Sequence, residues 1–222
     1  MKIITAPLAG ALALALIGMV NPLAPYARAD VEDDYHSHHQ HMMEGADSHA
    51  NHQHMMTEEM KRSMADYKLP QVKLVRDDGR SVSLAEELND ARPVIMNFIF
   101  TSCTAVCPVT SRIFSVFQDG LGSERNKIHM ISISIDPEQD TPAVLKKYAD
   151  KYGAGPDWHF YTGTAQASVA TQQEFGVYRG DKMNHTPVTL LRAAPGKPWV
   201  RIEGFASAGD LLHEYRALIA SR

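Results

Sequence analysis

This 222-residue chain is poor in cysteine, in basic charge and in long apolar runs. It has only two cysteines, Cys103 and Cys107, so every question about thiol chemistry concerns a single pair. Its 22 lysines and arginines stand against 26 acidic residues, a net charge of −4 with neutral histidines, and this balance argues against nucleic-acid binding. The apolar run Leu8–Val20 is shorter than the roughly 20 residues that a membrane-spanning helix needs.

Residues 1–29 have the organisation of a secretory signal peptide. Lys2 supplies the positive charge, Leu8–Val20 the apolar region and Ala27–Ala29 a cleavage site with small residues at both ends. No cysteine follows the apolar region, so a lipoprotein anchor is not expected; an uncleaved membrane tether is the alternative. We therefore predict export to the periplasm, an oxidising compartment in which a cysteine pair must be kept reduced, hold a metal or cycle.

Residues 30–66 are predicted to be a disordered metal-binding segment, since they are too polar to bury a core alone. They hold seven of the eleven histidines and six methionines, and the sequence His39–Met43 recurs as His52–Met56. These ligands suit copper, because the thioether of methionine selects Cu(I) and the imidazole of histidine binds either Cu(I) or Cu(II). A calcium or magnesium site is not expected, because the segment has too few aspartates among its histidines. The alternative is a linker with nonspecific affinity for zinc or nickel. The candidate auxiliary ligands are His36, His38, His39, His41, Met42, Met43, His49, His52, His54, Met55 and Met56.

Residues 67–222 are predicted to form one α/β domain, preceded by a short helix over 58–67. The expected strands cover residues 71–75, 80–84, 93–100, 127–135, 159–161, 187–191 and 199–202. The expected helices cover residues 84–89, 108–120, 142–152, 164–175 and 207–220. This order implies a mixed sheet with helices on both faces, a thioredoxin-like arrangement with an added N-terminal β-hairpin.

Both cysteines lie between the strand predicted over 93–100 and the helix predicted over 108–120. Sites of α/β proteins commonly occupy such strand-to-helix junctions. Pro108 suits the first helical position, which would make Cys107 the N-cap and direct the positive helix end at its sulfur, favouring the thiolate. Since a thiolate is both nucleophile and metal ligand, we predict a reactive or metal-binding pair. The alternative is two structural cysteines, buried or joined in a disulfide.

His185 is the candidate third ligand. It lies in a loop that enters the strand predicted over 187–191, and from there it could face the cysteine loop. Two thiolates and one imidazole would form a three-coordinate site suited to Cu(I). The alternative is a loop histidine satisfied by a backbone carbonyl. The other histidines of the domain lie inside predicted strands or a helix and are interpreted as ordinary core or surface residues: His129, His159 and His213.

The domain resembles the Sco/SenC family of copper-binding proteins with a thioredoxin fold, over roughly residues 68–222. The resemblance rests on three features. Residues Thr101–Pro108 contain the motif Cys-x-x-x-Cys-Pro, and residues Ser134–Pro142 contain the motif Asp-Pro-x-x-Asp-Thr-Pro. The third feature is a histidine late in the chain, just before a predicted strand. The resemblance implies delivery of copper to the dinuclear copper site of cytochrome c oxidase, or reduction of the cysteines of that site. The copper ligands that it implies are Cys103, Cys107 and His185.

Three positions qualify this resemblance. Many members have proline after the first cysteine, where this chain has Thr104, and many have aspartate before the late histidine, where this chain has Asn184. The second difference removes a carboxylate that could orient the imidazole. Thioredoxins place a cis-proline opposite the reactive cysteine, and Thr186–Pro187 occupies that place, so a cis bond is predicted there. These features leave room for a thiol–disulfide role.

The leading prediction is a periplasmic copper metallochaperone rather than an enzyme, with a copper-receiving partner such as a cytochrome c oxidase subunit. One alternative is a thiol–disulfide oxidoreductase, in which Cys103 attacks a partner disulfide, Cys107 resolves the mixed disulfide and a separate reductant restores the thiols. Thioredoxin-like enzymes usually have two residues between their cysteines, and the three residues here favour metal. Another alternative is a copper-buffering resistance protein that acts mainly through its N-terminal segment. Contact with a membrane is expected only through the partner or an uncleaved leader.

Overall fold

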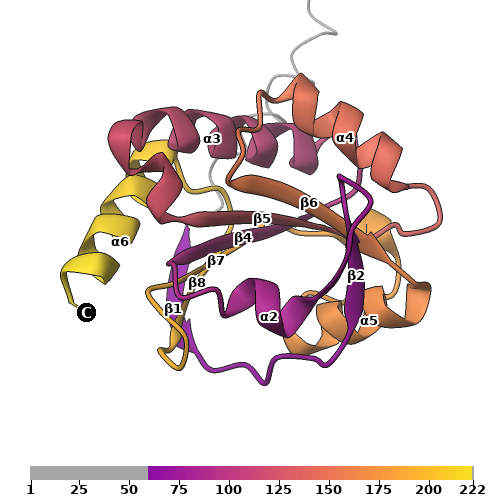
Figure 1. Cartoon of the computed structure of the whole chain (residues 1–222), viewed down its shortest axis with the longest axis horizontal. Helices are drawn as coiled ribbons and strands as arrows, with labels where there is room; N and C mark the ends of the chain where they lie inside the picture. Colours follow the sequence, from indigo (N-terminus) through magenta and orange to yellow (C-terminus); the bar gives the residue numbers. More distant parts are fainter. Residues whose placement is uncertain (1–59, 222) are drawn as a thin grey trace, which may run out of the picture. The chain divides into compact units, whose positions relative to one another are not determined.

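Strand β4, Val94–Ile99, lies near the middle of a mixed sheet with the strand order β1-β8-β7-β4-β5-β6-β2-β3 (Figure 1). The computed structural model describes residues 60–221, so the predicted leader and most of the predicted metal-binding segment lie outside the described residues. The other strands are β1 Lys61–Ala65, β2 Lys73–Arg76, β3 Ser81–Ser83, β5 His129–Ser134, β6 Trp158–Gly163, β7 Val188–Arg192 and β8 Trp199–Glu203. The helices are α2 Leu84–Leu88, α3 Val106–Gly120, α4 Pro142–Lys151, α5 Ala165–Glu174 and α6 Ala208–Ala220, with 3-10 turns η1 Gly122–Lys127 and η2 Lys182–Asn184. No helix in this described range has the length and apolar character of a membrane span.

Strands β4, β5 and β6 run parallel, and the other neighbouring strands pair antiparallel. Parallel neighbours need a crossover connection, which α3 provides between β4 and β5 and α4 provides between β5 and β6. The β2–β3 hairpin turns at Gly79, whose φ of 84° suits glycine, and joins the sheet through β2 and β6. The predicted thioredoxin-like mixed sheet with an added N-terminal hairpin is confirmed.

Side chains of β4 alternate between two hydrophobic cores, one on each face of the sheet. Ile95 and Ile99 pack in the core covered by α3, α4 and α6, whereas Met96 and Phe98 pack with residues of α2 and α5. Successive side chains of a strand point to opposite faces, so a strand buried on both faces reads as a continuous apolar run. Figure 1 shows α3 and α4 on one side of the sheet and α2 and α5 on the other, as predicted.

The predicted starts of α2, α4 and α6 are confirmed to within one residue, and each start has a capping side chain. Ser83 accepts a hydrogen bond from an amide in the first turn of α2, and Thr141 caps α4 with Pro142 as its first residue. Ser207 forms a reciprocal capping box with Asp210 at the start of α6. These side chains satisfy amides that a helix leaves without partners at its N-terminus.

The short helix predicted over 58–67 is wrong, because Lys61–Ala65 forms strand β1. This strand pairs antiparallel with β8 along its whole length, starting with Lys61 opposite Glu203. Lysine, arginine and methionine favour helix in isolation, but the open edge of β8 offers backbone hydrogen bonds that outweigh this weak preference. The sheet therefore begins inside the segment that the sequence pattern assigned to metal binding.

Helix α3 begins at Val106, two residues before the predicted start, so Cys107 lies within its first turn and is not the N-cap. The N-cap position holds an alanine, whose side chain makes no capping hydrogen bond. Val109 and Val116 of this helix are 37% and 44% exposed, whereas Phe117 is buried. The buried face also includes the side chain of Cys107, which places its sulfur in the core.

The cis bond predicted at Thr186–Pro187 is wrong, since no peptide bond within residues 60–221 is cis. The chain obtains its bend before β7 from the 3-10 turn η2, which ends at His185. Asp181 caps the start of this turn by accepting a hydrogen bond from the Met183 amide at 2.9 Å. A short 3-10 turn redirects the chain while leaving the proline bond in its more stable trans form.

Replacing Ser207 with alanine should lower the free energy of unfolding by about 1 kcal/mol. The change removes a hydroxyl that accepts from the Asp210 amide at 3.1 Å and donates to the Asp210 carboxylate at 2.6 Å. Denaturant unfolding followed by circular dichroism measures the loss. Ser123→Ala, at an exposed position of η1, is the control and should stay within about 0.5 kcal/mol of the wild type. Equal losses in the two variants would contradict the capping role.

Candidate functional site

The two cysteines lie on the loop after β4 and on the first turn of α3, at the carboxyl end of the parallel strands. Cys103 Sγ accepts a hydrogen bond from the Cys107 amide at 3.3 Å, and Cys107 Sγ accepts one from the Phe100 amide at 3.4 Å. The Cys103 amide donates to the Phe100 carbonyl oxygen at 3.2 Å. The loop thus folds back on the end of β4, and an amide of the helix N-terminus points at Cys103 rather than at Cys107.

The two thiols differ in exposure to solvent. Cys107 is fully buried, whereas Cys103 is partly exposed, and neither forms a disulfide. Burial raises the pKa of the Cys107 thiol, and the nearby Cys103 and Asp140 raise it further. The predicted preference for a Cys107 thiolate is therefore wrong, because the loss of hydration outweighs the favourable helix end. Cys103 is the sulfur that an incoming ligand or partner would reach first.

A buried carboxylate, Asp140, holds the start of the cysteine loop. It accepts hydrogen bonds from the Thr101 amide at 3.2 Å, the Thr101 hydroxyl at 2.5 Å and the Ser134 hydroxyl at 2.6 Å. A carboxylate without water needs such donors, so the three bonds fix the carboxylate and the loop together. In the sequence, Asp140 was noted only as part of the family motif, and its role as an anchor of the cysteine loop was missed. The only local signal for that role was its position directly before Thr141, the N-cap of α4.

His185 lies on the other side of the end of β4, just before β7. It is 9% exposed, and its Nε2 lies 3.0 Å from the Phe98 carbonyl oxygen. A carbonyl can only accept, so Nε2 carries the hydrogen and a neutral imidazole keeps its lone pair on Nδ1. Burial lowers the pKa of His185, which favours this neutral form. His185 therefore makes the backbone contact expected of a structural histidine and still offers Nδ1 as a metal ligand.

An ion pair holds the turn around His185. Lys182 Nζ lies 2.5 Å from the Asp136 carboxylate and 5.7 Å from the centre of the Phe100 ring. The imidazole of His185 lies 6.4 Å from the centre of the same ring in an edge-on arrangement. A cavity of about 500 Å³ is bounded in part by Asp136, Lys182 and His185. Phe100 therefore links the histidine turn to the cysteine loop.

All three candidate ligands lie at the end of β4 without being assembled into a metal site. Cys107 and His185 both bond to backbone groups of residues 98–100. Within residues 60–221, however, no three His, Cys, Asp or Glu side chains are arranged to hold a metal ion together. The loops would have to shift to bring Nδ1 of His185 to the two sulfurs. The auxiliary ligands predicted between residues 36 and 56 lie outside the described residues.

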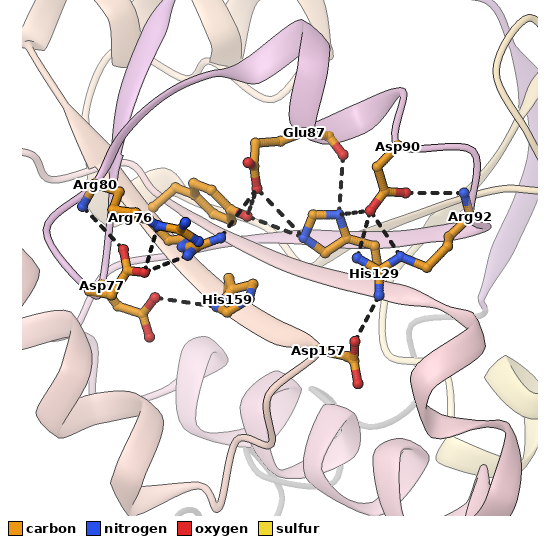
Figure 2. Close-up of polar contacts among 11 residues, drawn as sticks. Arg76, Asp77, Arg80, Glu87, Asp90, Arg92, His129, Asp157 and His159 are labelled. Atoms are coloured by element: carbon orange, nitrogen blue, oxygen red, sulfur yellow. Dashed lines mark hydrogen bonds and ion pairs between the residues drawn. The ribbon is translucent and has the colours of Figure 1, made fainter.

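Two other histidines of the domain lie far from the cysteine loop. His129 is buried at the start of β5, with Nδ1 3.1 Å from the Glu87 carbonyl oxygen and Nε2 3.2 Å from the Tyr161 hydroxyl. His159 on β6 lies 3.5 Å from Asp77. Figure 2 shows both rings within a network of carboxylates and guanidinium groups. Because β4, β5 and β6 are parallel, this network lies at the end of the sheet opposite the cysteines, and the prediction that His129 is a core residue is confirmed.

Comparison with protein families and curated proteins identifies relatives of this chain. The family model described as SCO1/SenC matches residues 57–220. The SCO1 protein homolog of Bacillus subtilis (strain 168) is 34% identical over 105 residues, which are 47% of this chain and 53% of that protein. The chain thus spans about half the length of the curated relatives that it matches.

Solved structures share the fold of the domain. BsSco, a member of the Sco family of cytochrome c oxidase assembly proteins in which a disulfide switch was identified, is 26% identical with a TM-score of 0.60. The match covers 72% of this chain and 98% of that one. Yeast Sco1 with copper bound is 20% identical with a TM-score of 0.60, over 71% of this chain and 91% of that one.

Replacing Asp140 with alanine should lower the free energy of unfolding by about 2–4 kcal/mol, because it leaves one buried and two partly buried donors without this acceptor. Asp140→Asn should cost less, since its amide oxygen can still accept. Asp150→Ala, which removes an exposed partner of Lys146, is the matched control and should cost less than about 1 kcal/mol. Urea unfolding at neutral pH measures all three. A loss at Asp140 no larger than at Asp150 would contradict the anchoring role.

Proposed function

The chain belongs to the SCO1/SenC family, and on this premise we propose that it is a periplasmic copper metallochaperone that carries copper on Cys103, Cys107 and His185. The observation that supports this proposal most is the convergence of two unbridged thiols and one neutral imidazole on the end of β4. Two soft sulfur ligands favour Cu(I), and an imidazole completes a three-coordinate site. Copper is the cargo of this protein, so its release to a partner matters as much as its binding.

Copper enters and leaves such a site by ligand exchange. Cys103, the more exposed sulfur, makes the first bond, and Cys107 follows after giving its proton to solvent, since burial raises the pKa of this thiol. His185 needs no deprotonation, because burial lowers its pKa and Nδ1 already bears a lone pair. Closure of η2 and the cysteine loop around the ion then brings Nδ1 to the sulfurs, so binding and loop ordering are coupled. Reversal of these steps passes the ion to a partner with a better site.

The relatives support both the cargo and the type of recipient. Yeast Sco1 has been solved with copper bound, and BsSco belongs to a family of cytochrome c oxidase assembly proteins. By extension, the recipient that we propose is the dinuclear copper site of a cytochrome c oxidase subunit. The leader predicted over residues 1–29 supports a periplasmic location.

A thiol–disulfide oxidoreductase is the second candidate, and one contact favours it. The Cys107 amide donates to Cys103 Sγ at 3.3 Å, which would stabilise negative charge on that sulfur. In this reaction the Cys103 thiolate attacks a partner disulfide and one partner thiolate leaves. Cys107 then attacks Cys103 Sγ and releases the second partner thiolate, so two electrons pass to the partner and the two cysteines become a disulfide. A separate dithiol reductant must restore them.

Replacing Cys103, Cys107 or His185 with alanine should each weaken Cu(I) binding by roughly a hundredfold or more. Each change removes a bond to the ion, and loss of even an outer partner of a metal ligand costs about 10–100-fold. Competition with a Cu(I)-specific chelator measures the affinity. His213→Ala, at an exposed position of α6, is the control and should bind as the wild type does.

Two results would change the proposal. Wild-type Cu(I) affinity in His185→Ala would overturn the three-ligand site. Rapid reduction of a disulfide substrate by the copper-free protein, together with weak copper binding, would favour the oxidoreductase instead.

Cu(I) affinity should rise with pH. Burial raises the pKa of the Cys107 thiol above its ordinary value, so between roughly pH 6.5 and 8.5 this thiol is protonated and must release a proton to bind the ion. The lowered pKa of His185 keeps its imidazole neutral in the same window, so it adds no dependence. The association constant should therefore rise about tenfold per pH unit for the Cys107 proton alone. Chelator competition at several pH values gives the logarithm of the association constant as a function of pH. The slope of this plot should be smaller by about one proton in Cys107→Ala than in the wild type. An unchanged slope would contradict the release of a proton by Cys107.

A further inference from the structure

The carboxylate of Asp136 is the buried half of the ion pair that holds η2. Asp136 lies on the loop between β5 and α4, and its side chain is 8% exposed, whereas that of Lys182 is 36% exposed. Lys182 Nζ donates to this carboxylate at 2.5 Å, and within residues 60–221 no other basic side chain lies within 4.0 Å of it. A buried carboxylate without a partner is costly, so the pair fixes Lys182 to one place on the domain.

Asp136 is itself tied to the start of the cysteine loop. Its amide donates to the Ser134 hydroxyl oxygen at 3.0 Å, and that hydroxyl donates to the Asp140 carboxylate at 2.6 Å. Asp140 also accepts from the Thr101 amide at 3.2 Å. A continuous chain of polar contacts therefore joins the cysteine loop to η2.

Lys182 and His185 stand at the two ends of one short turn. The His185 amide donates to the Lys182 carbonyl oxygen at 3.1 Å, so the position of one residue restricts the position of the other. The Lys182 ammonium and the His185 ring also share a neighbour, since they lie 5.7 and 6.4 Å from the centre of the Phe100 ring. Holding Lys182 in place therefore limits where the imidazole can lie.

The turn has room to move if it is released. It borders the cavity of about 500 Å³ that Lys182 and His185 help to line. The two residues between them, Met183 and Asn184, are exposed, so burial of their side chains does not hold the turn. The ion pair and the hydrogen bond from His185 Nε2 to the Phe98 carbonyl oxygen hold it against the end of β4 instead.

We propose that Lys182 is a positioning residue for copper binding: through its ion pair with Asp136 it holds η2 where His185 can complete the site that the two cysteines begin. This role rests on the copper-carrying function proposed above and adds a residue to the same site. Lys182 makes no bond to the ion, because an ammonium group has no lone pair to donate. Its removal should leave the cysteines in place and release the histidine.

Amide hydrogen exchange of the copper-free full chain tests whether Lys182 holds the turn. In Lys182→Gln, the amides of Asn184 and His185 should exchange roughly tenfold faster than in the wild type, because the turn opens more often. The amides of β4 and β5 should keep their wild-type rates, which would show that the change is local.

Arg179→Gln is the matched control for both charge and place. Arg179 lines the same cavity, but its guanidinium donates to two backbone carbonyl oxygens and forms no ion pair with a carboxylate of residues 60–221. The substitution removes the same charge from the same wall without breaking the pair. Exchange at Asn184 and His185 should therefore match the wild type.

Cu(I) affinity tests whether the held turn matters for copper. The reduced full chain receives less than one equivalent of Cu(I) and competes with a Cu(I)-specific chelator, while the ultraviolet absorption of Cu(I)–thiolate reports the cysteine site. Lys182→Gln should bind roughly tenfold more weakly, the lower end of the effect of an outer partner of a metal ligand. Lys182→Arg keeps the charge and should recover most of the affinity, and Arg179→Gln should bind as the wild type does.

The same substitution in a His185→Ala background shows whether Lys182 acts through His185. There Lys182→Gln should cause no further loss of affinity, because no imidazole remains to be positioned. An equal loss in both backgrounds would overturn the positioning role, since Lys182 would then act on the cysteines or on the fold.

The remaining outcomes separate the role of Lys182 from the function on which it rests. Wild-type affinity in Lys182→Gln, with His185→Ala still weakened, would overturn the role and leave the copper-carrying function standing. Wild-type exchange of the turn amides in Lys182→Gln would overturn it as well. If His185→Ala binds Cu(I) as tightly as the wild type, the three-ligand site fails, and the positioning role fails with it.

Discussion

The end of strand β4 is the constraint on which the candidate site depends. β4 is buried along its length between β5 and β7, so the backbone groups where it ends have no access to water and must bond to protein. The Phe98 carbonyl accepts from His185, and the Phe100 amide donates to Cys107. The requirement to satisfy these backbone groups therefore draws a histidine and a cysteine from distant parts of the chain to one place.

Burial also favours the neutral forms of Cys107 and His185 in the absence of a cation. It raises the pKa of Cys107 and lowers the pKa of His185, and both shifts disfavour the charged form of the side chain. The negative charge of Asp140 adds to the bias against a Cys107 thiolate. A bound cation reverses this balance, because it stabilises the thiolate directly, so deprotonation and metal binding occur together.

The two ends of the parallel strands show why a buried histidine alone does not indicate a site. At the starting end, both nitrogens of His129 have partners, and Arg92 bridges Asp90 and Asp157 at 2.5 and 2.7 Å, so these polar and charged groups have partners within the protein. At the other end, His185 has one bonded nitrogen and one with an available lone pair, beside a partly exposed thiol. Unused ligand capacity, rather than burial, distinguishes the candidate site.

The sequence by itself determined the elements that follow from local pattern, namely the central strands, the capped helix starts and the position of the cysteine loop, because periodicity and capping involve residues within a few positions. From the sequence we also predicted that the cysteine pair and His185 bind copper. Only the tertiary structure decided that residues 61–65 join the sheet and that burial raises the pKa of Cys107. It also decided that the bend before β7 needs no cis bond and that Asp140 anchors the cysteine loop. Each of these depends on strand pairing, burial or contacts between residues about 40 to 140 positions apart, and no local pattern contains that information.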